Sequence, residues 1–509
     1  MVNDSVPRCL VRARSRHRYD AVLLFTFLLT LPLVNPWVRG DGVGYYAYLR
    51  SLMVEHKLDF ANDWRSANES FVMGRVRADG SIDPLQYTRT GHLDNHFAVG
   101  PSILWAPFVT PVHGVILTLH KLGINVPANG YSHPYLITMA LATALYAFVG
   151  LFISFHLACL YTEKRWALLA TLGIWFASSL PVYMYFNPSW SHAHSVFIVA
   201  VFLWYWHRTR QGRAFPQWMI LGLISGLVLD VYYLNIAILL IPLGESLEGY
   251  WRGAAWPLLG GAVGRFWPSS KWGGRKWGAN WQAVRRLFAA NLLYCGATLV
   301  AFLPTLVTRK IIYGNPLDLG YGGASGILWN SPHLGSALFS SDHGLLVWTP
   351  ILILAVAGLF LFFKHDRSLA AYFVAALLAC CYLVGGHPNW DGISSFGNRF
   401  FVSLTPLFVL GLAVLFSTVE KGVKKKRTAL AWAGSLTSLL IAWNLAFIFQ
   451  WGTHMVPVRG LISWKQMVRN QFLVVPERAA ANFKAYFQHR RALMQRIEQE
   501  DVQQLKQRQ

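Results

Sequence analysis

The chain has 509 residues, of which 54% are hydrophobic and only 13% are charged. A soluble domain would have trouble hiding that much apolar surface from water, so the composition predicts an all-α polytopic membrane protein. The formal net charge of +22 comes from short basic clusters between apolar runs, with no basic face interleaved with aromatic residues. A nucleic-acid partner is therefore not expected. The five cysteines form no CxxC pair, and we expect no structural disulfide, metal or cofactor.

Several apolar runs approach the length of about 20 residues that a membrane-crossing helix needs. The clear candidates are roughly residues 20–38, 135–160, 166–184, 193–206, 286–307, 344–363, 368–384, 401–418 and 428–450. Two other stretches are ambiguous. One is 97–120, which prolines interrupt, and the other is 216–247, which carries Asp230 near its middle.

The basic residues indicate how these spans are oriented in the membrane, because short cytoplasmic loops are enriched in Lys and Arg. The basic clusters are Arg8–Arg18, Lys164–Arg165, Arg208–Arg213, Arg252–Arg286, Lys364–Arg367 and Lys421–Arg427. All of them fall on one side if 97–120 is a broken, membrane-skimming segment and 216–247 crosses twice, turning at 230–233. The result is a bundle of about eleven crossings with the N-terminus inside and the C-terminus outside. A conventional span at 97–120 is the open alternative.

This topology divides the chain into three parts. Residues 1–19 are expected to form a basic cytoplasmic N-terminus, 20–450 the transmembrane domain, and 451–509 a helical tail outside the membrane. The Gly- and aromatic-rich loops all fall on the outer face, at 39–96, 185–192, 230–233, 308–343 and 385–400. We therefore expect the chemistry on that face.

The first outer loop begins "RGDGVGYYAYLRSL", which places Asp41 just beyond a predicted span. A carboxylate at that boundary suits a general base, although Asp-Gly is also an ordinary turn or helix cap. Behind it, Tyr45, Tyr48, Leu49 and Leu52 recur at helical spacing, which predicts an amphipathic, juxtamembrane helix lying on the membrane. Such a helix would hold Asp41 at the lipid–water boundary, with Tyr45 as a substrate-binding candidate.

Other outer-face residues are further substrate-binding candidates. Asp59 and Asp63 in "LDFANDW" are candidates to bind a sugar hydroxyl or to cap a helix, and the alternative is that both acids are simply solvated in a long loop. Asn187 and His192 in "YFNPSWSHAHS" bind a sugar or a phosphate, or begin a helix. Asp230 is a candidate because ionisable residues within membrane segments are costly.

The last outer loop, "GGHPNWDGISSFGNRFF", carries Trp390, Asp391 and Arg399. Trp390 and Asp391 complete the substrate-binding candidates. A guanidinium at the mouth of a span holds a phosphate with paired donors, or snorkels toward lipid head groups.

Together, "DGVGYYAYLRSL", "NHFAVGPSILWAPF", "NPSWSHAHSVF", "LFSSDHGLLVWTP" and "WDGISSFGNRFF" resemble the loops of bacterial integral-membrane glycosyltransferases of the GT-C superfamily. Protein O-mannosyltransferases and aminoarabinose transferases belong to this group. The resemblance implies a polyprenyl-phosphate-linked hexose or pentose donor, a lipid, glycan or protein acceptor, and a periplasmic active site in the inner membrane. It also implies that Asp41 is the general base, and Arg399 could supply a cation to the donor phosphate. Many relatives have Asp-Glu where this chain has Asp41-Gly42.

A transporter or flippase of a lipid-linked or anionic substrate is the alternative function. Transporters usually show internal repeats and charges near the bilayer midplane. This sequence has no evident repeat, and its polar residues gather on one predicted face. The pattern favours a transferase.

Overall fold

The computed structural model describes residues 8–252, 281–320, 326–330 and 332–507. Within these ranges the chain is helical, and its only β features are isolated bridges at Val76–Ile82 and Tyr87–Leu93. The predicted all-α class is confirmed for the described chain. Most of the basic cluster at 252–286, residues 1–7 of the predicted N-terminal segment and part of the loop at 308–343 lie outside the described residues.

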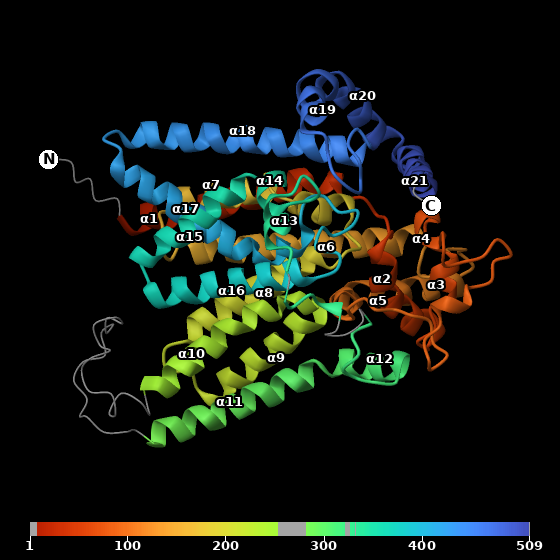
Figure 1. Ribbon diagram of the computed structural model, residues 1–509, viewed down its shortest axis with the longest axis horizontal. Helices are drawn as coiled ribbons and strands as arrows, with labels where there is room; N and C mark the ends of the chain where they lie inside the picture. Colours follow the sequence, from red (N-terminus) through yellow and green to blue (C-terminus); the bar gives the residue numbers. More distant parts are fainter. Residues whose placement is uncertain (1–7, 253–280, 321–325, 331, 508–509) are drawn as a thin grey trace.

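The longer helices form an elongated bundle, and most of them run along its long axis (Figure 1). They are α1 (Arg8–Thr30), α6 (His133–Ala158), α7 (Lys164–Phe176), α8 (His192–Thr209), α9 (Phe215–Val231), α10 (Leu240–Tyr250), α11 (Trp281–Ala301), α15 (Ile351–Leu361), α16 (Arg367–Gly386), α17 (Thr405–Gly422) and α18 (Lys426–Gly452). The deepest core lies where α17 passes through the bundle, since 94% of its best apolar window is buried.

The remaining helices are shorter or lie off the bundle axis, and most gather at one end (Figure 1). They are α2 (Asp41–Arg50), α3 (Ala61–Arg65), α4 (Glu69–Val72), α5 (Gly100–Lys121), α12 (Leu303–Tyr313), α13 (Leu334–Phe339), α14 (Leu345–Trp348), α19 (Trp464–Arg469), α20 (Val475–Gln488) and α21 (Arg490–Lys506). The connections α15–α16 and α17–α18, with their basic clusters, lie at the other end together with the start of α1. These clusters are thus separated from the loop of Asp41 by the length of the bundle.

The expected number of crossings is not confirmed. Five helices among the described residues are long and apolar enough to cross a membrane, namely α5, α6, α16, α18 and α17 with its preceding turn. A sixth is possible if α11 and α12, which are bent by 49°, form one span. The difference arises because other predicted spans are built from short helices, such as α7 with 13 residues and α15 with 11.

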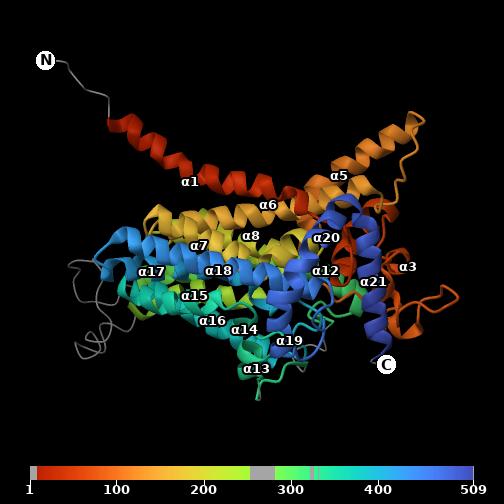
Figure 2. The same cartoon turned by 90° about the horizontal axis from the view of Figure 1, so that it is seen from above.

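The two ambiguous stretches are both resolved into helices. Helix α5 carries Pro107 and Pro111 in its interior and projects obliquely from the bundle (Figure 2). Its relation to the membrane stays a prediction. Helix α9 ends at Val231, and an extended Tyr232 and a 3-10 turn lead into α10. The apolar run is therefore interrupted at 232–239, as a turn near 230–233 requires, whereas the double crossing of the membrane stays a prediction.

The predicted helix behind Asp41 exists as α2, but its predicted position on the membrane surface is wrong. Every residue of α2 after Asp41 is buried. Ser102 of α5 donates a hydrogen bond to the Tyr45 carbonyl at 2.6 Å and accepts one from the Leu49 amide at 2.9 Å. Two glycines permit this close packing, since a Cβ at Gly44 would collide with the Phe97 ring and one at Gly42 with Ser189.

Candidate functional site

Asp41 forms an ion pair with Arg399, from the other end of the sequence. Asp41 Oδ2 lies 2.5 Å from Arg399 Nη1. Asp41 opens α2 behind Gly40, whose φ of +53° favours glycine, and Arg399 opens the turn that leads into α17. The Arg399 side chain is 9% exposed, whereas that of Asp41 is 30% exposed. The carboxylate is therefore accessible, while the cation that holds it is buried.

Arg399 is also held by aromatic rings. Its guanidinium carbon lies 4.4 Å from the centroid of the Trp190 ring and 5.4 Å from that of Phe400. A desolvated cation over an indole gains about 2 kcal/mol. Arg399 thus has a fixed orientation behind Asp41.

Packing explains why no acid follows Asp41. A Cβ at position 42 would overlap the Ser189 hydroxyl and its Cβ. Any side chain there would have to displace the loop that carries Trp190. Gly42 is required by this contact, and a second carboxylate does not fit.

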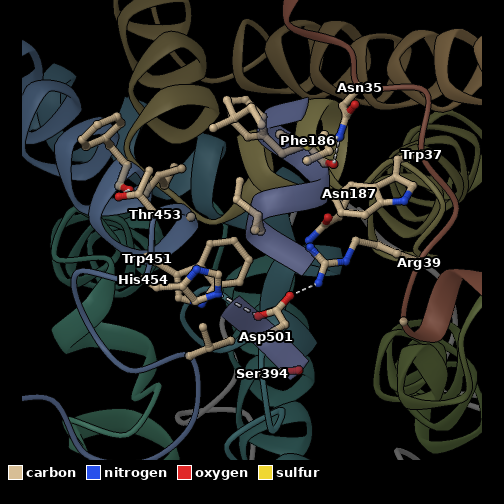
Figure 3. Close-up of a pocket in the computed structure, with 18 of the residues that line it drawn as sticks. Asn35, Trp37, Arg39, Phe186, Asn187, Ser394, Trp451, Thr453, His454 and Asp501 are labelled. Carbon is tan, nitrogen blue, oxygen red and sulfur yellow. Dashed lines mark hydrogen bonds and ion pairs between the residues drawn. The ribbon is translucent and has the colours of Figure 1, made fainter. Parts of the chain in front are cut away.

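A cavity of about 670 Å³ opens beside Asp41. The polar side chains that line it include Arg39, Asp41, Arg75, Asn187 and Arg459. Arg75 lies within electrostatic reach of Asp41 and of Arg459, and we call this part of the lining the polar end. The other walls of the cavity are largely apolar, and Figure 3 shows part of this lining. A volume in this range is typical of sites for small organic ligands, and the division into polar and apolar parts fits an amphiphilic ligand.

The C-terminal tail closes one side of the cavity. Arg39, two residues before Asp41, forms an ion pair with Asp501 of α21, and its guanidinium also lies 3.4 Å from Glu498. Asp501 in turn contacts His454 Nε2 at 2.7 Å, and Glu500 contacts His454 Nδ1 at 2.8 Å. Figure 3 shows Arg39, Asp501 and His454 in line. Burial opposes protonation of His454, but the two carboxylates outweigh it and raise the pKa of the imidazole.

A second set of contacts links the tail to the same loop. Glu498 Oε1 accepts hydrogen bonds from the Asn68 side chain at 2.9 Å and from the Ser70 amide at 2.6 Å. Asn68 Oδ1 in turn accepts one from the Gly40 amide at 3.1 Å. The tail therefore holds Arg39 and Gly40, the two residues before Asp41. The predicted C-terminal helical tail exists, but it is a wall of the candidate site and not a separate appendage.

Besides Arg399, three of the residues expected at the site lie near Asp41. Asn187 lines the cavity directly. Tyr45 and His192 are buried behind it. The His192 ring packs against those of Tyr183 and Trp190, with centroids 4.8 and 6.2 Å away. Burial, reinforced by the charge of Asp41, raises the pKa of Tyr45, so this phenol stays protonated.

The other expected residues are not brought to the cavity. Asp59 pairs with Lys57 at 2.8 Å and accepts a hydrogen bond from the first amide of α3 at 3.0 Å. Asp63 is buried in an ion pair with Arg50 at 2.8 Å.

Asp230 does not lie at a solvent-exposed tip. It is fully buried and accepts a hydrogen bond from Thr305 at 2.5 Å. Trp390 and Asp391 lie in the loop before Arg399, where their carbonyls accept hydrogen bonds from Asn398 and Ser395 at 2.9 and 3.5 Å. Neither lines the cavity.

Sequence reasoning missed the cationic and acidic residues that surround Asp41, namely Arg39, Arg75, His454, Arg459, Glu498 and Asp501. One signal was available: Glu498 and Asp501 are three residues apart and share a helix face. Across the described part of the chain, His, Cys, Asp and Glu form no group of three that could hold a metal ion.

No family model and no curated protein matches the chain. Among solved structures, the chain is similar to the archaeal oligosaccharyltransferase AglB from Archaeoglobus fulgidus in complex with an inhibitory peptide and a dolichol-phosphate. The two share 12% sequence identity, and the match covers 86% of this chain and 58% of AglB with a TM-score of 0.44. The apo form of the Archaeoglobus fulgidus oligosaccharyltransferase gives 13% identity over 85% and 58%, with a TM-score of 0.45. The chain thus spans less than two thirds of their length.

Proposed function

We propose that this protein is a membrane glycosyltransferase that moves a sugar from a polyprenyl-phosphate carrier to the hydroxyl of a lipid, glycan or protein acceptor. The observation that carries the proposal is an accessible carboxylate, Asp41, held by a buried cation at the mouth of a cavity with polar and apolar parts. A general base and room for an amphiphilic donor are what this reaction requires.

In the proposed reaction Asp41 accepts the proton of the acceptor hydroxyl, and the oxygen attacks the anomeric carbon of the sugar. The bond between that carbon and the phosphate oxygen breaks, and the carrier phosphate leaves with the electron pair. Arg399 orients Asp41, and its positive charge stabilises the developing negative charge nearby. Arg399 stands behind Asp41 and Trp190, so direct contact with the phosphate falls to cations that line the cavity.

We place the enzyme in the bacterial inner membrane, with the N-terminus in the cytoplasm and the active site on the periplasmic face. This proposal is supported by the separation of the basic clusters at 364–367 and 421–427 from the loop of Asp41.

The test is a transfer assay. Purified full-length protein is incubated with a panel of polyprenyl-phosphate sugars and candidate acceptors, and release of the carrier phosphate is followed. Asp41→Asn is expected to lower the rate by about 10²- to 10⁴-fold, the usual contribution of a general base. Asp79→Asn is the matched control, since Asp79 lies in the same loop and its carboxylate accepts hydrogen bonds from the amide and the hydroxyl of nearby Ser81. Full activity of Asp41→Asn would remove Asp41 as the base, and movement of intact donor across liposomes without bond cleavage would favour a flippase.

A further inference from the structure

The apolar part of the cavity is built largely by the C-terminal end of the chain. Its walls include Leu445 and Phe449 of α18, Ala479 and Phe483 of α20, and Ile497 of α21. These side chains offer a hydrocarbon surface and no hydrogen-bonding groups. An apolar chain of a ligand would gain roughly 25 cal/mol for each Å² that it buries there.

A strip of exposed apolar side chains leads along α18 to this cavity. Trp432 is 74% exposed and Leu439 is 65% exposed, and the same helix face continues to Ala446, which lines the cavity. Only 22% of the best apolar window of α18 is buried. In a membrane this face would contact lipid, so a lipid chain has a continuous apolar path from the bilayer into the cavity.

Helix α20 fits a position at the membrane interface. Phe483 and Phe487 are exposed and pack together, with ring centroids 4.8 Å apart. Glu477, Arg478 and Lys484 provide a polar face. Bulky apolar residues on one face and charges on the other are typical of helices that lie in the head-group region. The tail would then cover the cavity at the level where a lipid head group emerges.

Two cations lie at the polar end of the cavity. Arg75 and Arg459 both line it, and the side chains are close enough to influence one another. Arg75 Nη1 donates to the Phe71 carbonyl at 2.9 Å, and its guanidinium carbon lies 4.3 Å from the Phe71 ring centroid. No carboxylate among the described residues lies within ion-pair distance of Arg75. Burial lowers the pKa of this guanidinium, and Asp41 and Asp94 offset the effect in part. Such a site favours an anion.

We propose that α18, α20 and α21 bind the hydrocarbon chain of a polyprenyl phosphate, and that Arg75 and Arg459 bind its phosphate beside Asp41. The identity of this lipid as the sugar carrier rests on the proposed function. The C-terminal tail is then part of the substrate site, because without it the chain pocket has no outer wall. Among anionic lipids we commit to the carrier, since Asp41 at the same polar end places the phosphate next to the reacting group.

The binding test uses the full-length protein in detergent, with native mass spectrometry as the readout and polyprenyl phosphate as the probe. Ala479→Trp fills the chain pocket, and Ala480→Trp is its matched control on the exposed side of α20. Arg75→Gln removes the cation, and Arg77→Gln, at a half-exposed position outside the cavity, is its control. We expect both cavity variants to weaken binding at least about tenfold and both controls to bind as wild type does.

A second probe set identifies the source of the phosphate. The neutral polyprenol and phosphatidylglycerol are offered in competition with polyprenyl phosphate. We expect neither to displace it at equal concentration, and equal displacement by phosphatidylglycerol would replace the carrier with bulk anionic lipid and overturn the proposal. A photo-crosslinking residue at position 483 should label the bound chain, whereas the same residue at Phe472, which is exposed and outside the cavity, should not.

The proposed lipid site and the proposed function can be refuted independently of each other. Unchanged binding in Ala479→Trp and Arg75→Gln, with normal sugar transfer, would overturn this site and leave the proposed function standing. Carrier binding that depends on both residues, with no transfer from any polyprenyl-phosphate sugar, would support the site and contradict the proposed function.

Discussion

The contact between Asp501 and Arg39 joins the last helix to the residue two positions before Asp41, and Asp501→Asn tests its importance. The substitution keeps the size of the side chain and removes its charge. The Arg39 and Asp501 side chains are 17% and 13% exposed. Water therefore screens this pair less than it would screen a surface pair. We expect α21 to detach from the first loop more often in this variant.

The structure sets the size of the effect. Asp501 receives two charge-assisted hydrogen bonds, from Arg39 and His454, and such bonds contribute about 1.5–3 kcal/mol each. Part of this is retained, because Glu498 still faces Arg39 at 3.4 Å and Glu500 still bonds His454 at 2.8 Å. We therefore expect a loss of about 2 kcal/mol in the docking of α21, which is about a 30-fold change in its opening equilibrium.

Hydrogen exchange followed by mass spectrometry measures this opening. Amides of α21 and of the segment 37–44 should exchange about 30-fold faster in Asp501→Asn, while those of α6 and α8 stay unchanged. Glu477→Gln is the control for loss of an acid from the tail, because Glu477 is exposed on α20. Wild-type exchange in α21, or faster exchange throughout the bundle, would refute the idea of a local clamp.

Two further outcomes are expected. Arg399→Ala should lower the transfer rate about 10- to 100-fold, because Asp41 loses the charge-assisted contact that holds it. In an Asp41→Asn background the same change should cost little, and equal losses in both backgrounds, measured by release of the carrier phosphate, would contradict this coupling. Because the pKa of His454 is raised in the folded chain, its stabilising effect is complete below the unfolded value of about 6.5 and is lost as the pH rises through the folded value. Exchange of α21, corrected for intrinsic rates, should therefore quicken with rising pH in wild type, and a pH response unchanged in His454→Gln would assign the effect elsewhere.

Composition was sufficient to predict the helical class of the described residues, and the basic clusters at 364–367 and 421–427 lie together at one end of the bundle. The break between α9 and α10 was also predictable, because an acid and two tyrosines interrupt an apolar run there. The number of spans was less predictable. Helices such as α7 and α15 are short, and the chain completes its path with turns and π-helical segments such as Val182–Phe186. Apolar runs do not distinguish continuous helices from interrupted ones.

At the site, the sequence pointed to Asp41 and Arg399 separately, and the structure pairs them across 358 positions. No local pattern encodes such a pairing. Burial of α2 was mispredicted because its aromatic residues suit a membrane surface and a protein core equally well. The two glycines at positions 42 and 44 were the better indicators, since each lies where a neighbouring side chain leaves no room for Cβ.

The tail shows most clearly what composition cannot reveal. Residues 490–506 have the polar, helix-forming composition of a solvated appendage, and on that basis alone an independent helix is the natural prediction. Yet Arg490 donates to the Val34 and Pro32 carbonyls at 2.6 and 2.7 Å, and Asp501 reaches Arg39 at the far end of the same helix. Most polar side chains of a surface helix face water. Arg490 and Asp501 instead bind the backbone carbonyls and the Arg39 guanidinium of one loop. Helix α21 thus fixes the segment from residue 32 to residue 40. A substitution of Asp501 is therefore expected to affect the position of Asp41, although the two residues are 460 positions apart in the sequence.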